Sequence, residues 1–317
     1  MSFRTEIVRP IARATGRNIR LPSKAGHFEA FEEGGAPVLQ LTTDQETLAG
    51  GLQSDEVAGP FFLACFGWWQ AHLGGREPQL RVVVEGAPWE LGPDQHRSWI
   101  ALEALQQALG DRLEIQGWPA RLWPRSPVLN HSGLDRDGLK PSRKREALCE
   151  AQLCEERQHA RALGLHRMHR QLPLGVFDGV VSEDTAWTPG GGARADLWGL
   201  GLDGAFHLFE LKVGKNIKVG ILPELFAYAW ILAMVRDGTV LARGPAAEAL
   251  RVAPRLHAWT LAPELHPLLS HEGRGPLEWM AAGLAGRVEL GCLFFEEQAG
   301  SRPFATWQPE RTQRFGR

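Results

Sequence analysis

A short apolar segment that carries two charges limits what this chain can fold into. Residues 205–213, AFHLFELKV, are apolar at most positions, which is typical of a strand buried on both faces of a sheet. Glu210 and Lys212 interrupt it two residues apart, so both side chains leave the same face of the strand. Burying an acid and a base without a role is costly, and we therefore expect a functional site here. An ion pair on an exposed edge strand is the alternative.

The segments around these charges alternate between strand and helix patterns, which favours an α/β fold. Asp203-Gly204 lies between two apolar runs and is a hairpin signal. In chain order, the predicted elements of this half are a polar helix at 141–163, strands at 172–181, 195–202 and 205–213, a helix at 220–238, a strand at 255–262, a helix at 276–286 and a strand at 288–297.

The first part of the chain shows a second alternation of the same kind. Its predicted elements are strands at 36–43, 79–86 and 113–117 and helices at 59–73 and 93–110, with a capping box at Thr43–Glu46 before another helix. Residues 118–141 lose periodicity and contain four prolines, so we place a boundary there. We expect a smaller α/β domain at 1–128, for recognition, sensing or partner binding, with its own core containing Trp68, Val83, Trp99 and Leu102. The second domain then covers 129–317.

Composition and charge exclude several classes of protein. The net charge of −2 over 317 residues gives no overall positive field that would attract nucleic acid, so any phosphate binding must be local. The apolar runs are too short to span a bilayer, and the N-terminus lacks the apolar core of a signal peptide. The four cysteines form no C-x-x-C pair, which favours neutral thiols in a cytoplasmic protein. The match of 199–204, GLGLDG, to a dinucleotide fingerprint is discounted, because a strand follows it instead of a helix.

A third charged residue indicates what the site could do. Asp196 lies near the start of the preceding strand, and two carboxylates that meet across a hairpin can hold Mg²⁺ through oxygens. A two-residue loop at Asp203-Gly204 would set Asp196 opposite Leu211 and send the two acids to different faces. A loop of three or five residues, or a bulge at 199–204, sets Asp196 opposite Glu210, and we predict one of these.

The pattern resembles that of the PD-(D/E)XK nuclease superfamily: an acid after Ala195, a hairpin, then Glu210-Leu211-Lys212. Ala195 stands where the name-giving proline of that motif would be. The resemblance implies a restriction-endonuclease-like core of a helix, a three-stranded meander, a helix and a strand. It also implies a metal-dependent phosphodiesterase that acts on DNA. Its metal ligands would be Asp196, Glu210 and the Leu211 carbonyl, its catalytic lysine Lys212, and its metal Mg²⁺, with Mn²⁺ as the alternative.

Four further residues are accessory candidates. Glu224 and Tyr228, in ELFAY, resemble the Q-x-x-x-Y element of the exonuclease-like branch, with glutamate in place of glutamine. They lie four residues apart on one helical face, and Tyr228 is the only tyrosine of the chain. The family often has an acid on its first helix, which would be Glu146 or Glu150. The pattern does not distinguish between these two.

Binding partners are indicated only by local charge. Lys215 and Lys218 follow the motif and could contact phosphates, and residues 140–170 hold eight Lys or Arg against four Glu. DNA is the expected substrate, with RNA left open, and no membrane partner is expected. A homodimer would allow both strands to be cut, and a restriction or anti-phage role, alone or in a larger defence complex, suits the layout by analogy. The competing hypothesis is a non-catalytic nucleic-acid-binding or scaffold protein on the same fold.

Overall fold

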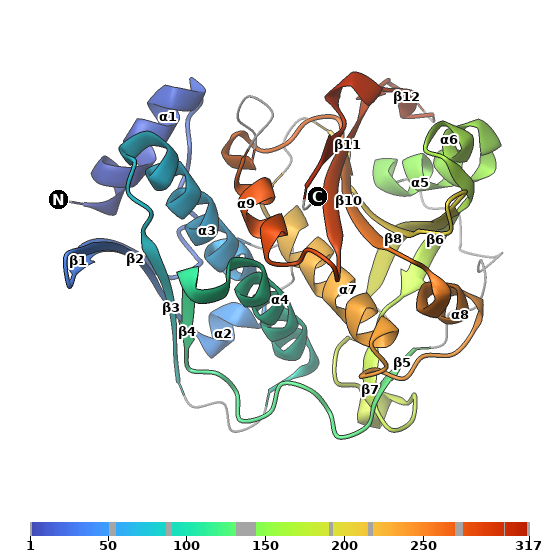
Figure 1. Cartoon of the computed structure of the whole chain (residues 1–317), viewed down its shortest axis with the longest axis horizontal. Helices are drawn as coiled ribbons and strands as arrows, with labels where there is room; N and C mark the ends of the chain where they lie inside the picture. The colour runs from blue at the N-terminus through green and yellow to red at the C-terminus, as the bar shows by residue number, and fades with distance from the viewer. Residues whose placement is uncertain are drawn as a thin grey trace.

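The structure is a computed structural model that describes residues 2–50, 55–86, 91–130, 144–189, 193–214, 218–269, 275–300 and 302–315. It is mixed α/β, with two main sheets that lie on either side of a layer of helices (Figure 1). None of the helices within these ranges is both long enough and apolar enough to cross a membrane.

The N-terminal sheet has the strand order β1-β2-β3-β4, with β1 antiparallel to β2 and the other pairs parallel. The predicted strands and long helices of this region are present. The structure adds β1 and the N-terminal helical segment, and it moves the helix cap from Thr43 to Asp44, whose carboxylate accepts the N–H of Thr47 at 2.7 Å. The elements are a π-helical turn at Arg4–Val8, α1 (Arg9–Thr15), β1 (His27–Glu33), β2 (Ala36–Asp44), α2 (Gln45–Leu48), α3 (Asp55–Gly74), β3 (Gln79–Glu85), α4 (Pro93–Leu109) and β4 (Leu113–Gln116).

The second sheet has the order β12-β11-β10-β9-β8-β6, with β13 also beside β11. Strands β6, β8 and β9 form an antiparallel meander, and β10 and β11 continue the sheet parallel to β9. Helix α7 packs on one face and α5 and α6 lie at the other (Figure 1). The elements are α5 (Arg145–Glu155), α6 (Arg157–Ala162), β6 (Leu165–Pro173), β8 (Arg194–Gly201), β9 (Phe206–Leu211), α7 (Ile221–Arg236), α8 (Pro245–Val252), β10 (Leu256–Ala262), α9 (Pro276–Ala282), β11 (Glu289–Glu297), β12 (Phe304–Trp307) and β13 (Gln313–Arg314).

Two predictions for this half were wrong in their boundaries. The described part of the helix expected at 141–163 is two helices, which meet at Glu156 in extended conformation. The strand expected at 172–181 begins instead at Leu165 and ends at Pro173, and 176–178 form β7, which pairs with β5 (Pro127–Leu129) as a separate ribbon. Strand β6 is at the edge of the sheet and half exposed, so its sequence is polar and lacks the apolar pattern of a buried strand.

The two sheets are separate, but the buried side chains between them form one continuous cluster. Trp99 and Leu102 are fully buried in it, whereas Trp68 and Val83 are only partly buried. The separate core expected for residues 1–128 is therefore not observed. The carboxylate of Glu103 on α4 accepts the indole N–H groups of Trp123 and, across the interface, of Trp230 on α7. The boundary at 128 stays a prediction, and the sequence around it connects regions that share a core.

Candidate active site

The hairpin between β8 and β9 has the register that a shared site requires. Leu197 pairs with Phe209 and Gly199 with His207, and the Gly201 N–H donates to the Ala205 carbonyl at 2.8 Å. Residues 202–204 thus form a three-residue loop, whose last residue, Gly204, has a φ of +80° that glycine adopts without strain. Of the predicted arrangements, the three-residue loop is the one observed. Continued by one residue, this register sets Asp196 opposite Glu210.

The two strands part at that position. The N–H of Leu211 donates to Asp196 Oδ2 at 2.8 Å, so a side-chain carboxylate takes the place of a backbone acceptor. The N–H and C=O of one strand residue point toward the same neighbouring strand. The carbonyl of Leu211 therefore faces the side on which Asp196 lies, as its predicted role as a metal ligand requires.

Lys212 lies at the centre of an acidic cluster drawn from four segments of the chain. Its ammonium is 2.7 Å from Glu210 Oε1, 3.4 Å from Glu224 Oε2, 3.7 Å from Glu146 Oε1 and 3.9 Å from Asp196 Oδ2. Five of the residues predicted from sequence are thus brought together. Asp196, Glu210 and Glu224 are buried, and Lys212 is largely enclosed by them.

Burial and mutual repulsion govern the charges in this cluster. Burial raises the pKa of Asp196 to about 7; the Lys212 ammonium opposes this shift, and Glu150 and Glu146 add to it. The pKa of Glu210 is raised well above its usual value by burial and then by the neighbouring Asp196 and Glu224. Burial opposes the charge of Lys212, but the surrounding carboxylates hold its pKa well above the ordinary value. Lys212 is therefore an ammonium, and the cluster holds more acid than it can neutralise.

Glu150 is held beside the site by Gln171, a residue that the sequence did not indicate as part of the site. Its carboxylate is buried and accepts from Gln171 Nε2 at 2.9 Å and from Arg170 Nε at 3.3 Å. The pairs on either side of Gln171 set it opposite Asp196 in the sheet. Its φ of +55° is the only positive value among the described non-glycine residues, so this backbone is held in an unfavourable conformation beside the site. No local pattern in the polar β6 sequence marks Gln171 out.

Tyr228 lies one helical turn beyond Glu224 on α7, and both side chains are buried. Burial raises the pKa of the Tyr228 phenol, and the charges of Glu224 and Glu210 raise it further. The phenol is thus within electrostatic reach of the acidic cluster and keeps its proton. Glu224 and Tyr228 thus lie near Glu210, and their service to a common site stays a prediction.

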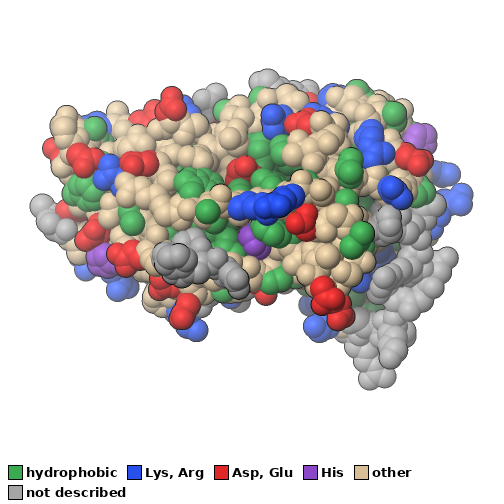
Figure 2. All heavy atoms as spheres, turned by 90° about the horizontal axis from the view of Figure 1, so that it is seen from below, with side chains coloured by type: hydrophobic (Ala, Val, Ile, Leu, Met, Phe, Trp, Pro, Cys, Tyr) green, Lys and Arg blue, Asp and Glu red, His purple; other side chains and the backbone are tan. Residues whose placement is uncertain are grey.

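The predicted phosphate contacts are less well defined. Lys215 lies outside the described residues, and Lys218 is exposed just before α7. In the basic segment, Arg145 pairs with Glu297 and Arg170 with Glu150, which neutralises part of the local excess. Acidic and basic side chains are interspersed over most of the face in Figure 2. His159 of the same segment is buried against Phe304 and hydrogen-bonded to Glu156.

The donor set fits a hard divalent cation with few protein ligands. Within the described ranges, no three Asp, Glu, His or Cys side chains are arranged to hold a metal by themselves. Mg²⁺, however, usually uses one or two carboxylates and keeps several waters. Asp196, Glu210 and the Leu211 carbonyl supply such a set, and Glu210 Oε2 is buried with no hydrogen-bond partner among the described residues. A cation beside this oxygen would satisfy it and offset the excess acid.

The chain matches no protein-family model, and no curated protein or solved structure shows significant similarity to it.

Proposed function

We propose that this protein is a Mg²⁺-dependent nuclease that hydrolyses phosphodiester bonds in DNA. The observation that carries the proposal is the register of β8 and β9, which sets Asp196 opposite Glu210, together with the Lys212 ammonium within 4 Å of both carboxylates. Two acids and a lysine on adjacent strands are the residues that the PD-(D/E)XK pattern requires.

Each of these residues has a role that its surroundings support. Asp196, Glu210 and the Leu211 carbonyl would hold the metal, which when bound supplies a Lewis acid and lowers the pKa of coordinated water. Lys212 carries a fixed positive charge that can orient the attacking water and stabilise negative charge on the phosphate. Tyr228 keeps a proton that it can donate as a hydrogen bond, and Glu224 helps to hold Lys212.

The order of the elements also supports the proposal. Helices α5 and α6, the meander β6-β8-β9, helix α7 and strand β10 beside β9 follow the order that the restriction-endonuclease-like core implies. The N-terminal region would select the target or receive a signal, and a restriction or anti-phage role is the biological setting that we propose for this layout.

Cleavage assays would test the proposal directly. Supercoiled plasmid, linear duplex, single-stranded DNA and RNA are incubated with the protein in Mg²⁺, in Mn²⁺ or in chelator. We expect cleavage of DNA that requires the metal and is lost in Glu210→Ala and Lys212→Ala. Glu248→Ala, which removes an exposed carboxylate on α8, is the matched control and should cleave as the wild type does.

Two results would contradict the proposal that this protein is a nuclease. Full activity in Glu210→Ala would separate cleavage from this cluster. Binding of DNA without cleavage under every metal condition would instead favour the non-catalytic nucleic-acid-binding protein. Calorimetric titration with Mg²⁺ distinguishes these cases further, since we expect one site in the wild type and none in Glu210→Ala.

A further inference from the structure

Gln171 lies beside the acidic cluster in a strained conformation, and the roles proposed above do not use it. It is on β6, and the strand pairs on either side of it set it opposite Asp196. Its φ of +55° is in the left-handed region, which is unfavourable for a residue with a long side chain. Strain of this kind persists where the surrounding structure holds it, and it is concentrated at functional sites.

The side chain of Gln171 fixes the carboxylate of Glu150. Its amide Nε2 donates to Glu150 Oε2 at 2.9 Å, and Arg170 Nε donates to the same oxygen at 3.3 Å. Both donors thus use one oxygen of a carboxylate that is buried on α5. Glu150 Oε1 makes no hydrogen bond within the part of the chain that the structure describes. The fixed carboxylate therefore keeps one acceptor oxygen unused.

Glu150 is close enough to Asp196 to influence its charge. Burial is the main cause of the raised pKa of Asp196, Lys212 opposes it, and Glu150 adds to it. Glu146, one helical turn earlier on α5, is partly exposed, and its carboxylate lies 3.7 Å from the Lys212 ammonium. Of the two candidates on the first helix, Glu150 is thus the one that is buried and held in place beside a predicted metal ligand.

We propose that Gln171 is a positioning residue for the metal site, whose left-handed backbone directs its amide to Glu150 and keeps that carboxylate beside Asp196. In this arrangement Glu150 Oε1 accepts a hydrogen bond from a water that Mg²⁺ retains. Glu150 is then the first-helix acid of the site, and Glu146 pairs with Lys212. The inference rests on the proposed nuclease function, since it concerns the same metal site.

Calorimetric titration with Mg²⁺ tests the inference without relying on cleavage. Gln171→Gly removes the amide and adopts the positive φ freely. Gln171→Asn tolerates the same φ, but its amide is one methylene too short to reach Glu150. We expect each change to weaken Mg²⁺ binding about tenfold, the loss typical when a residue that orients a metal-site group is replaced.

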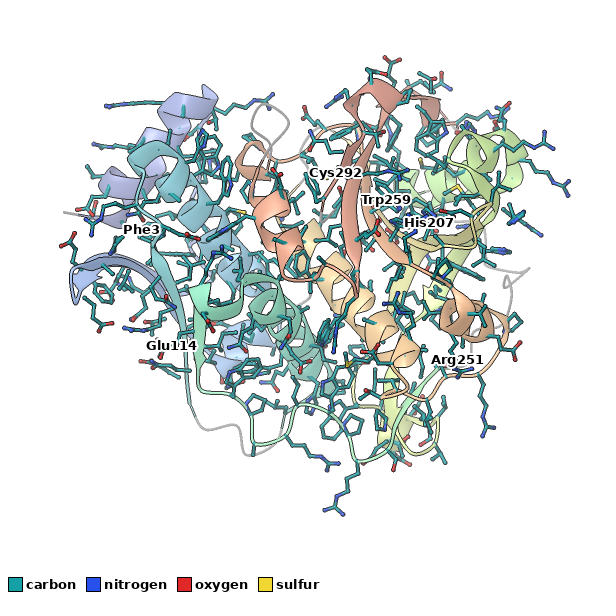
Figure 3. All side chains as sticks on the ribbon, in the orientation of Figure 1. Phe3, Glu114, His207, Arg251, Trp259 and Cys292 are labelled. Atoms are coloured by element: carbon teal, nitrogen blue, oxygen red, sulfur yellow. The ribbon has the colours of Figure 1, made fainter. Side chains whose placement is uncertain are left out.

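Gln116→Asn is the matched control. Gln116 is also a strand glutamine whose amide donates to a carboxylate, in this case Glu114 Oε1 at 2.7 Å. Glu114 is on the N-terminal sheet, across the helical layer from β6 (Figure 3). Gln116→Asn therefore removes a hydrogen bond of the same kind far from the acidic cluster and should bind Mg²⁺ as the wild type does.

A double-mutant cycle separates positioning from a general loss of structure. Glu150→Gln removes the charge and should weaken Mg²⁺ binding at least as much as Gln171→Gly does. In the Glu150→Gln background, Gln171→Gly should cause no further loss, because the group that it positions no longer acts. A purely structural role would instead give losses that add. In cleavage assays, excess Mg²⁺ should restore the rate of Gln171→Gly, with the KM for DNA unchanged.

The inference alone is overturned if the wild type binds Mg²⁺ and both Gln171 variants bind it equally well, or if the losses in the cycle add. It is also overturned if Gln171→Gly weakens binding and Gln171→Asn does not, which would assign the effect to backbone freedom. A wild type that neither binds Mg²⁺ nor cleaves DNA overturns the proposed function and this inference with it. Thermal unfolding in chelator confirms that each variant is folded.

Discussion

At the scale of single residues, the ammonium of Lys212 and its four carboxylate neighbours set the chemistry of the site at neutral pH. One cation cannot offset four buried or partly buried acids, and this excess of acid adds to the burial that raises the pKa values of Asp196 and Glu210. A bound metal ion would offset this excess of acid and would replace the protons on these carboxylates. Metal binding should therefore release protons and should weaken as pH falls through about 7.

Tyr228→Phe tests the second half of the ELFAY match. The change removes the hydroxyl from a buried side chain beside Glu224 and Glu210 and keeps the ring that fills the core. We expect the cleavage rate to fall about tenfold, the loss typical of one hydrogen bond to a charged group, with the thermal midpoint nearly unchanged. An unaltered cleavage rate would mean that the phenol has only a packing role.

His96→Phe tests the pH dependence of stability. His96 is buried and stacked on Trp187 with centroids 4.0 Å apart, and burial lowers its pKa from 6.5 to about 4, with the nearby Arg121 adding to the effect. The unfolded chain thus binds this proton more readily than the folded one. The contribution of His96 to stability is present above pH 6.5 and is lost as pH falls toward 4.

Phenylalanine keeps the stack and cannot titrate. Urea denaturation near neutral pH and at about pH 5 should show that the variant loses on the order of 2 kcal/mol less than the wild type on acidification. His166→Gln, at an exposed position, is the control and should follow the wild type. Equal losses in all three proteins would rule out His96 as an acid-sensitive group.

The site residues could be predicted from sequence to the extent that local spacing determines them. Glu210 and Lys212 share a face because strand residues alternate, and Glu224 and Tyr228 share one because they are a helical turn apart. Gln171 could not be found in this way. Its contact with Glu150 depends on a positive φ and on the packing of α5 near an edge strand, which are tertiary features.

At the scale of elements, the β8–β9 hairpin brings Asp196 and Glu210 together. Gly204 ends its three-residue loop at φ +80°, and the nearest atom to an added Cβ would be Pro254 Cδ at 3.7 Å, an ordinary contact. Gly204→Ala should therefore lower the free energy of unfolding by about 1 kcal/mol through backbone strain alone, and Gly204→Asn by less.

Gly74→Ala is the matched control for this change. Gly74 is in the last turn of α3, has open space around its Cα and no positive φ, so alanine there should be neutral or slightly stabilising. Chemical denaturation of the three variants measures the difference. A cost at position 204 no larger than at position 74 would show that the loop does not need a left-handed residue.

Helices and strands could be predicted from the sequence where one or both sides are buried, because burial gives their apolar residues a regular pattern. Strands β2, β3, β9 and β10 and helices α3, α4 and α7 have strong apolar patterns, and each was expected near its observed position. Edge elements could not be predicted in the same way. Strands β1 and β6 are exposed on one side, so their sequences are polar and depend on the neighbouring strand for their structure.

At the scale of the whole molecule, the two sheets are held together by a helical layer in which α4 packs along α7. Glu103 provides a polar contact within this layer, since it accepts the N–H groups of Trp123 and Trp230 at 3.0 and 2.7 Å. Burial raises the pKa of Glu103, which those two donors and Arg287 counteract.

Glu103→Ala would leave two indole N–H groups without their acceptor in a largely buried environment. We expect the free energy of unfolding to fall by about 2 kcal/mol or more. We also expect one cooperative transition in the wild type, followed equally by far-UV circular dichroism and tryptophan fluorescence. Glu248→Ala should unfold as the wild type does. Two separate transitions in the wild type would instead support an independently stable domain at 1–128.

The shared helical layer also constrains how the two halves of this protein can have evolved. The two halves of the chain bury their apolar sides against each other. Neither half could be exchanged between genes as an independent module, because it would expose this apolar side in a new protein. Relatives of this chain should thus have inherited both halves together. Substitutions should be coupled across the layer, so that a lineage that replaces the acid at position 103 also replaces the indole at position 230.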